Sequence, residues 1–145
     1  MLVLVGGCAS TRPGAASSCN ERCEFGRASI MPILAVERAR APEKTVFCVR
    51  SELDLSSVEL GTVLESCRAL GIDAWVQDEC PARAGPRVGL LVRQVKRSSA
   101  NEEWWVPFEL GAPVDHVWSG SVVVRKAGGR WSLVRLEYDD WRPSH

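Results

Sequence analysis

The clearest pattern along the chain lies in residues 116–138, where apolar and polar positions alternate on both sides of the glycine pair 128–129. Alternation with a period of two predicts strands, and two such runs joined by glycines predict a β-hairpin. A two-residue loop would place Val122 opposite Arg135, whereas a three-residue loop places Val122 opposite Val134 and makes one face almost wholly apolar. We therefore expect the three-residue loop, because a slip of one residue exchanges the two faces of a strand.

The best-defined helix is predicted over Ser56–Leu70. Ser56 and Glu59 have the spacing of a capping box, in which each residue bonds the backbone N–H of the other. The apolar residues that follow recur three and four positions apart, and Gly71 suits a left-handed C-terminal cap. This helix should bury one apolar stripe against a sheet.

Four further runs read as strands from their β-branched and aromatic content or their alternation: residues 44–50, 72–77, 87–96 and 104–110. Residues 30–41 are apolar enough for either a short helix after Pro32 or a first strand, and the pattern leaves both open.

One helix followed by successive paired strands predicts an α+β domain. We expect one main helix packed on a strongly antiparallel sheet of about five or six strands, as this class of fold commonly has. The strand–helix–strand unit at residues 44–77 also permits a ferredoxin-like fold. The order of elements over residues 45–140 and the Gly-x-Trp ending at Trp131 resemble cystatin-like and NTF2-like domains. For the NTF2-like family this resemblance implies a pocket between helix and sheet, and it transfers no catalytic residue.

The first eight residues end in Val-Gly-Gly-Cys8, which resembles the lipobox of bacterial lipoproteins. In that family a signal segment is removed before the cysteine, which then carries the lipid. The resemblance implies a truncated lipoprotein signal over residues 1–8, a membrane anchor at Cys8 and a periplasm-facing place in the bacterial cell envelope. The alternative is a chance match in a cytoplasmic protein. Residues 9–28 are poor in large apolar side chains and predict a flexible tether, leaving residues 29–145 as a single α+β domain.

The net charge and the cysteine content of the chain indicate which partners to expect and whether disulfides form. The chain has 145 residues and a formal net charge of zero, so no overall field favours nucleic acid and no nucleic-acid partner is expected. Six cysteines suggest an oxidising compartment, and their spacing matches no zinc signature, so neither a metal nor another cofactor is expected. We expect at least one disulfide drawn from Cys48, Cys67 and Cys80, although Cys67 also fits a buried apolar position.

Catalytic signals are sparse. His116 beside Asp115 is the only base-like pair in the body of the domain, and no serine occurs in a nucleophile-elbow context. No glycine-rich phosphate loop follows a strand. We therefore expect a protein that is not an enzyme.

A candidate binding face follows from the expected hairpin register. That register gathers aromatic, aliphatic and arginine side chains on one side of the sheet, a composition enriched at the centres of protein interfaces. Its members are Trp105, Val123, Arg125, Trp131, Leu133 and Arg135. In the alternative, the N-terminal segment covers this face as ordinary core.

Two functions remain from the sequence. The first is a lipid-anchored envelope protein that binds a protein partner through this face. The second is a small-ligand or enzymatic domain with a pocket between helix and sheet and His116 at its mouth.

Overall fold

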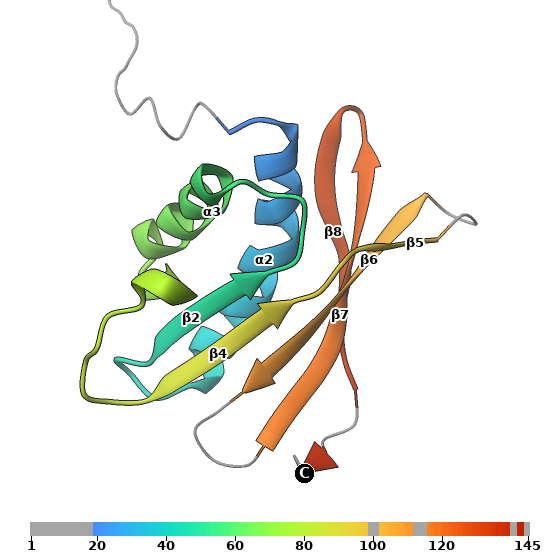
Figure 1. Ribbon diagram of the computed structural model, residues 1–145. Coiled ribbons are helices and arrows are strands. Elements are labelled where there is room, and N and C mark those ends of the chain that lie inside the picture. Colours follow the sequence, from blue (N-terminus) through green and yellow to red (C-terminus); the bar gives the residue numbers. More distant parts are fainter. Residues whose placement is uncertain (1–18, 99–101, 112–115, 140–141, 144–145) are drawn as a thin grey trace, which may run out of the picture.

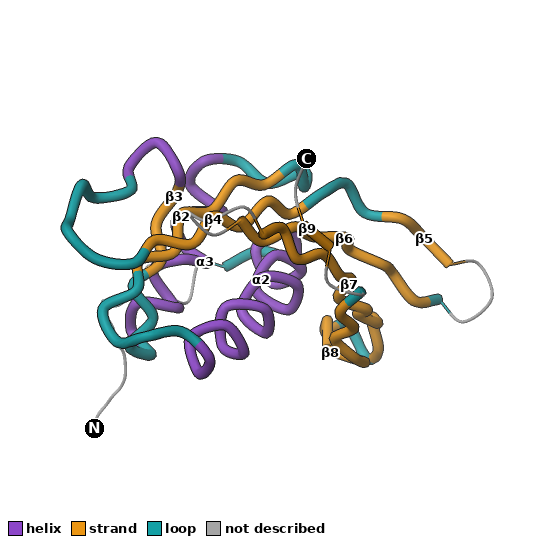
Figure 2. Tube along the Cα trace, turned by 90° about the horizontal axis from the view of Figure 1, so that it is seen from below, coloured by secondary structure: helices purple, strands orange, loops and turns teal. Residues whose placement is uncertain are grey.

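Two helices pack on one face of a mixed β-sheet (Figures 1 and 2). The computed structural model describes residues 19–98, 102–111, 116–139 and 142–143. The elements follow in the order α2 (Glu21–Arg40), β2 (Val46–Ser51), α3 (Ser57–Ala69), β3 (Ala74–Val76), the 3₁₀ turn η2 (Gln77–Glu79), β4 (Arg87–Val92), β5 (Lys96–Ser98), β6 (Glu103–Gly111), β7 (His116–Ala127), β8 (Arg130–Tyr138) and β9 (Arg142–Pro143).

The main path of the sheet runs β3-β2-β4-β6-β7-β8, with β5 paired to β6 and β9 paired to β7. Strand β2 is parallel to both of its neighbours, β3 and β4, and the remaining pairs are antiparallel. The expected α+β class is confirmed, but the sheet is mixed and carries two helices. Parallel pairing arises because α3 crosses over between β2 and β3, and parallel neighbours need such a crossover.

Helix α2 begins inside the segment expected to be a flexible tether. Asn20 caps it by accepting a hydrogen bond from the Cys23 N–H at 2.9 Å, and its side-chain amide donates to Glu59 at 2.7 Å. A methyl group added to Gly26 would lie 2.8 Å from Cδ1 of Leu55. The small residues that suggested a linker therefore permit close packing, and the tether prediction is wrong from residue 21 to residue 28. Residues 1–18 lie outside the described part of the chain.

Helix α3 matches its prediction. Both capping-box bonds are present: the Ser56 N–H donates to Glu59 at 2.8 Å, and the Glu59 N–H donates to the Ser56 hydroxyl at 3.1 Å. The helix ends at Ala69 with Leu70 as its C-cap, and Gly71 follows with a φ of 85°. The local signals at both ends were sufficient to define this element.

The β7–β8 hairpin is present, but its expected register is wrong. Its loop consists of Gly128 and Gly129 alone, with φ values of 60° and 78°. We had expected three loop residues, because two would place Val122 opposite Arg135. A one-residue bulge in β8 removes that conflict: the pairing shifts between Val124 and Val123, so Val122 faces Leu136.

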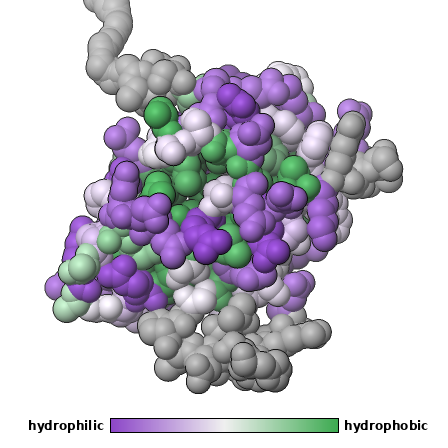
Figure 3. All heavy atoms as spheres, in the orientation of Figure 1, coloured by the Kyte–Doolittle hydropathy of each residue, from purple (hydrophilic) through white to green (hydrophobic). Residues whose placement is uncertain are grey.

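The core lies between the helices and the sheet. Buried side chains from α2, α3 and the strands form one cluster, and its largest fully buried members include Phe47, Phe108, Ile30, Ile33, Leu34 and Leu64. The opposite face of the sheet is turned toward the viewer in Figure 1, where β2 and β4 lie in front of α2. On this face hydrophilic and hydrophobic residues are intermixed (Figure 3).

Candidate functional site

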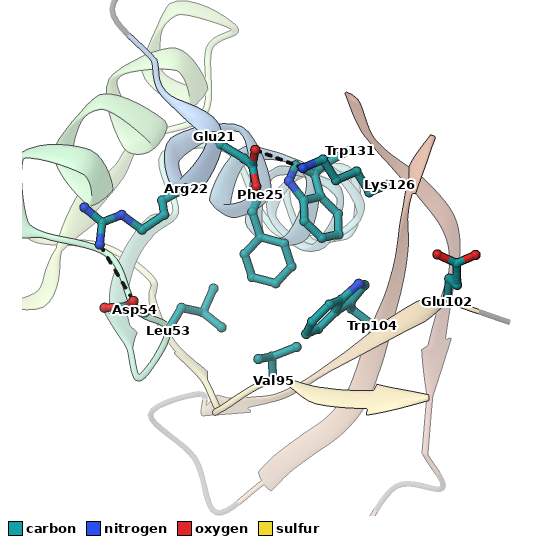
Figure 4. A pocket seen from close by; sticks show the side chains of 10 residues that line it. All are labelled: Glu21, Arg22, Phe25, Leu53, Asp54, Val95, Glu102, Trp104, Lys126 and Trp131. Carbon is teal, nitrogen blue, oxygen red and sulfur yellow. Dashed lines mark ion pairs between the residues drawn. The ribbon is translucent and has the colours of Figure 1, made fainter. Parts of the chain in front are cut away.

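A cavity of about 520 Å³ opens between the first turns of α2 and the sheet (Figure 4). Its apolar walls come from five segments: α2, the turn after β2, the residue before β5, β6 and β8. The apolar side chains point toward a common space, and charged ones lie around its rim. The apolar set is Phe25, Leu53, Val95, Trp104 and Trp131, and the charged set is Glu21, Arg22, Asp54, Glu102 and Lys126.

Three aromatic rings form one wall of this groove. The ring of Trp131 lies 4.8 Å from that of Phe25 and 5.9 Å from that of Trp104, both centroid to centroid and in edge-to-face geometry. Such contacts add to the free energy of burial and fix the relative orientation of the rings. They tie α2, β6 and β8 together, so the wall is formed before any ligand arrives.

One polar atom in this wall lacks a partner. Among the described residues, the indole Nε1 of Trp131 is buried and makes no hydrogen bond. A buried donor without an acceptor destabilises the fold by about 1–3 kcal/mol, so such groups are normally paired. Because this atom is buried, an acceptor oxygen from a bound molecule would reach it only after a neighbouring side chain had moved aside.

The rim is held by ion pairs between elements distant in sequence. The Lys126 ammonium lies 2.9 Å from the Glu21 carboxylate and connects the hairpin to α2. Arg22 lies 3.7 Å from Asp54 and 3.4 Å from Glu59. A hydrogen bond from the Ser56 backbone, with another from the Asn20 amide, lowers the pKa of Glu59, which therefore stays charged opposite Arg22.

The six residues of the candidate binding face are not brought together. Trp131 faces the helices and contacts Phe25, because the bulge in β8 changes the faces that its residues occupy. Leu133 pairs with Val124 rather than with Val123, and its side chain is 46% exposed.

The other four members lie together on the uncovered face of the sheet. Val123 is fully buried there, beneath a pair in which the Arg135 guanidinium stacks 5.0 Å from the Trp105 ring centroid. Glu103 accepts from Arg125 at 2.8 Å and lies 3.6 Å from Arg135. These charges are therefore largely neutralised within the molecule.

The cysteines partly match expectation. Cys48 and Cys80 form a disulfide, so the predicted disulfide is confirmed, and Cys67 is the free buried cysteine of the described chain. Burial raises the pKa of the Cys67 thiol to about 11. A second disulfide joins Cys19, the residue before the Asn20 cap, to Cys23 in the first turn of α2. It was missed because both residues were placed in the tether.

His116 does not lie at the mouth of the groove. It is the first residue of β7 and pairs with Pro143 of β9, whereas Lys126, at the rim, is near the opposite end of the same strand. Within residues 19–98, 102–111, 116–139 and 142–143, no group of three metal-binding side chains is found. Over the same residues, no helix is long and apolar enough to cross a membrane.

Comparisons of this chain with protein-family models, with curated proteins and with solved structures found no match. The resemblance to cystatin-like and NTF2-like domains consequently gains no support beyond the shared α+β class. The function must be argued from the geometry of this molecule.

Proposed function

We propose that this protein is a binding module whose groove between α2 and strands β6–β8 holds a small, mainly apolar ligand carrying a hydrogen-bond acceptor. The observation that carries this proposal is the buried, unpartnered indole N–H of Trp131 in the wall of an open apolar cavity. Ligand sites commonly occupy about 300–1,000 Å³ and combine apolar walls with a few polar groups. The groove has both properties.

The construction of the groove favours a binding site over a packing defect. Proteins rarely leave a contiguous apolar surface uncovered outside a binding site. Here the walls come from segments as distant as Phe25 and Trp131, and ion pairs from Lys126 and Arg22 fix the rim. A ligand would enter a largely preformed space, with a local side-chain movement that uncovers the Trp131 N–H.

Nuclear magnetic resonance of the tryptophan indole groups tests this proposal. The chain has six tryptophans, and Trp131→Phe assigns the signal of interest. Octan-2-one is the probe, and 2-methyloct-1-ene, which has the same shape without the acceptor oxygen, is its matched control. We expect the ketone to shift the Trp131 N–H signal downfield and to leave that of Trp105 unchanged. A Trp131 signal that does not respond to saturating ketone would contradict the proposal.

A second candidate function is protein binding through the uncovered face of the sheet. It is favoured by one observation: α2 and α3 both lie on the other face of the sheet, and Trp105 is only half-buried on this face beside Arg135. Trp105→Ala should leave the melting temperature within a few degrees of the parent and abolish capture of a partner from envelope extract. Capture that survives this substitution would remove the candidate.

We further propose that the protein is attached to the bacterial cell envelope through a lipid on Cys8 and faces the periplasm. Two disulfides support an oxidising compartment. Intact-mass measurement on protein purified from its native cell provides the test. A mass increase from acyl groups on Cys8, with the preceding residues removed, is the expected result. An unmodified chain that retains Met1 would instead indicate a cytoplasmic protein.

A further inference from the structure

A second hollow, of about 500 Å³, surrounds the Cys48–Cys80 disulfide on the uncovered face of the sheet. Cys48 is on β2 and is only 7% exposed, whereas Cys80 is half-buried in the loop that follows η2. Arg50 and Arg87 also line this hollow. Cys80 is therefore the more exposed of the two cysteines, and its sulfur is the expected point of attack by a molecule from solvent.

A guanidinium is fixed against the sulfur of Cys48, the more buried cysteine. Nη1 of Arg87 lies 3.2 Å from Sγ of Cys48, and Nη2 donates to the Pro81 carbonyl at 2.7 Å. A positive charge beside a sulfur stabilises its thiolate and lowers the pKa of the corresponding thiol. A thiolate that is stabilised in this way leaves more readily during disulfide exchange.

The charge of the hollow selects among attacking thiols. Among the described residues, neither Arg50 nor Arg87 has a carboxylate partner. Glu109, the acidic residue that lines the hollow, is held 3.1 Å from Arg93. Two uncompensated guanidinium groups favour an anionic molecule at this site.

We propose that Cys48–Cys80 is a thiol–disulfide exchange site for a small thiol that carries carboxylate groups. The incoming thiolate attacks the Cys80 sulfur and forms a new S–S bond to it. The Cys48–Cys80 bond breaks, and its electron pair leaves with Cys48 as a thiolate beside Arg87. A second thiolate of the same kind can then release Cys80 as a thiolate and form the small-molecule disulfide, so two electrons pass from two thiols to the protein.

The Cys19–Cys23 disulfide provides an internal comparison. It lies at the start of α2, on the other side of the molecule from this hollow, and no described guanidinium donates to either of its sulfurs. Both disulfides experience the same solution during one experiment. A preference that is specific to the hollow must therefore appear at Cys48–Cys80 and be absent at Cys19–Cys23.

The experiment compares three thiols on the full chain at equal thiolate concentration: anionic glutathione, neutral 2-mercaptoethanol and cationic cysteamine. Reaction is stopped by alkylation, and peptide mass spectrometry measures opening at each disulfide. We expect glutathione to open Cys48–Cys80 fastest and cysteamine slowest, with the first adduct on Cys80 and no such order at Cys19–Cys23. Equal rates for the three thiols at Cys48–Cys80, or a first adduct on Cys48, would overturn the proposal.

Two variants separate the roles of the arginines. Arg87→Gln should slow opening by all three thiols about three- to tenfold, because the leaving thiolate loses its cation. Arg50→Gln, at an exposed position, should reduce the advantage of glutathione while leaving the rate with 2-mercaptoethanol unchanged. Arg130→Gln removes the same charge at an exposed position on β8 and should change neither rate. An unchanged order of thiols in Arg50→Gln, together with unchanged rates in folded Arg87→Gln, would show that the arginines do not act on this disulfide.

Discussion

The phenol of Tyr138 donates a hydrogen bond of 2.6 Å to the carboxylate of Glu37, which joins the end of β8 to the last turns of α2. The Tyr138 ring also lies edge-to-face with Phe108 at 5.5 Å and under the Arg40 guanidinium at 4.7 Å. Because β8 is an edge strand of the main sheet path, this cluster fastens that edge to the helical layer.

Tyr138→Phe should lower the free energy of unfolding by about 1.5–3 kcal/mol, the range for a hydrogen bond to a charged group. The ring contacts with Phe108 and Arg40 are retained in this variant, so the loss reports the hydroxyl alone. Chemical denaturation at neutral pH measures it. A variant as stable as the parent would show that water satisfies Glu37 equally well.

The same bond predicts a loss of stability in alkali. Burial, together with the hydrogen bond to Glu37, raises the pKa of Tyr138 above its ordinary value of 10.0. The unfolded chain ionises near that value while the folded chain does not, so Tyr138 makes stability fall as pH rises above about 10. Denaturation curves of the parent should fall more steeply there than those of Tyr138→Phe, and parallel curves would contradict this assignment.

The buried thiol of Cys67 should also make the free energy of unfolding fall as pH rises, beginning at a lower pH than Tyr138. Burial raises its thiol pKa from 9.0 to about 11, so the thiol ionises at a lower pH in the unfolded chain than in the folded chain. Stability from this group is complete below pH 9 and is lost as pH rises toward 11, by about 2–3 kcal/mol in total. Cys67→Ala should be less stable than the parent at pH 7 because it leaves a cavity, yet lose less stability between pH 9 and 11. Equal losses in both proteins over that interval would exclude a Cys67 contribution.

Two glycines in helices should respond oppositely to alanine. At Gly26 the added methyl group would lie 2.8 Å from Leu55 and 3.3 Å from Val63, so the two helices must separate or Leu55 must change rotamer. At Gly61 nothing lies within 4 Å. Gly61→Ala should raise the melting temperature through a helix-propensity gain of up to about 1 kcal/mol, and Gly26→Ala should lower it. Thermal unfolding of the two variants decides the point, and stabilisation by both would show that the α2–α3 contact yields easily.

Trp131→Ala should cost about 3–5 kcal/mol, the usual range for removing a large aromatic side chain from packed surroundings. Trp105→Ala is its matched control, since Trp105 lies on the uncovered face and contacts Arg135. Thermal denaturation should separate the two variants by many degrees. Similar small losses in both would mean that the ring wall contributes little to stability.

Local signals explain what the sequence could predict. The capping box of Ser56 and Glu59 and the Gly128–Gly129 loop concern residues close in the chain, so α3 and the hairpin were found. The bulge in β8 is set by packing on both faces of the sheet and has no local signal, so the register was wrong and Trp131 was assigned to the wrong face.

The groove depends on the first turns of α2, which were predicted to belong to the tether; a helix was one of two alternatives only for residues 30–41. Its buried positions Cys23, Gly26, Ile30 and Ile33 do follow helical spacing, but Gly26 carries no side chain and hid the pattern. Phe25 was therefore never considered as a binding residue. A search for helical spacing in which glycine and other small residues are counted as buried positions would have indicated this helix.

The Cys19–Cys23 bridge and the Asn20 cap fix the start of α2, whose first turns form the rim of the groove. Position 19 lies eleven residues after position 8, and a fully extended segment of that length spans about 40 Å. A lipid on Cys8 would thus hold the groove within about that distance of the bilayer. The local concentration of the groove would then be far higher near the membrane surface than in the surrounding fluid. Molecules that leave the membrane would therefore meet it more often.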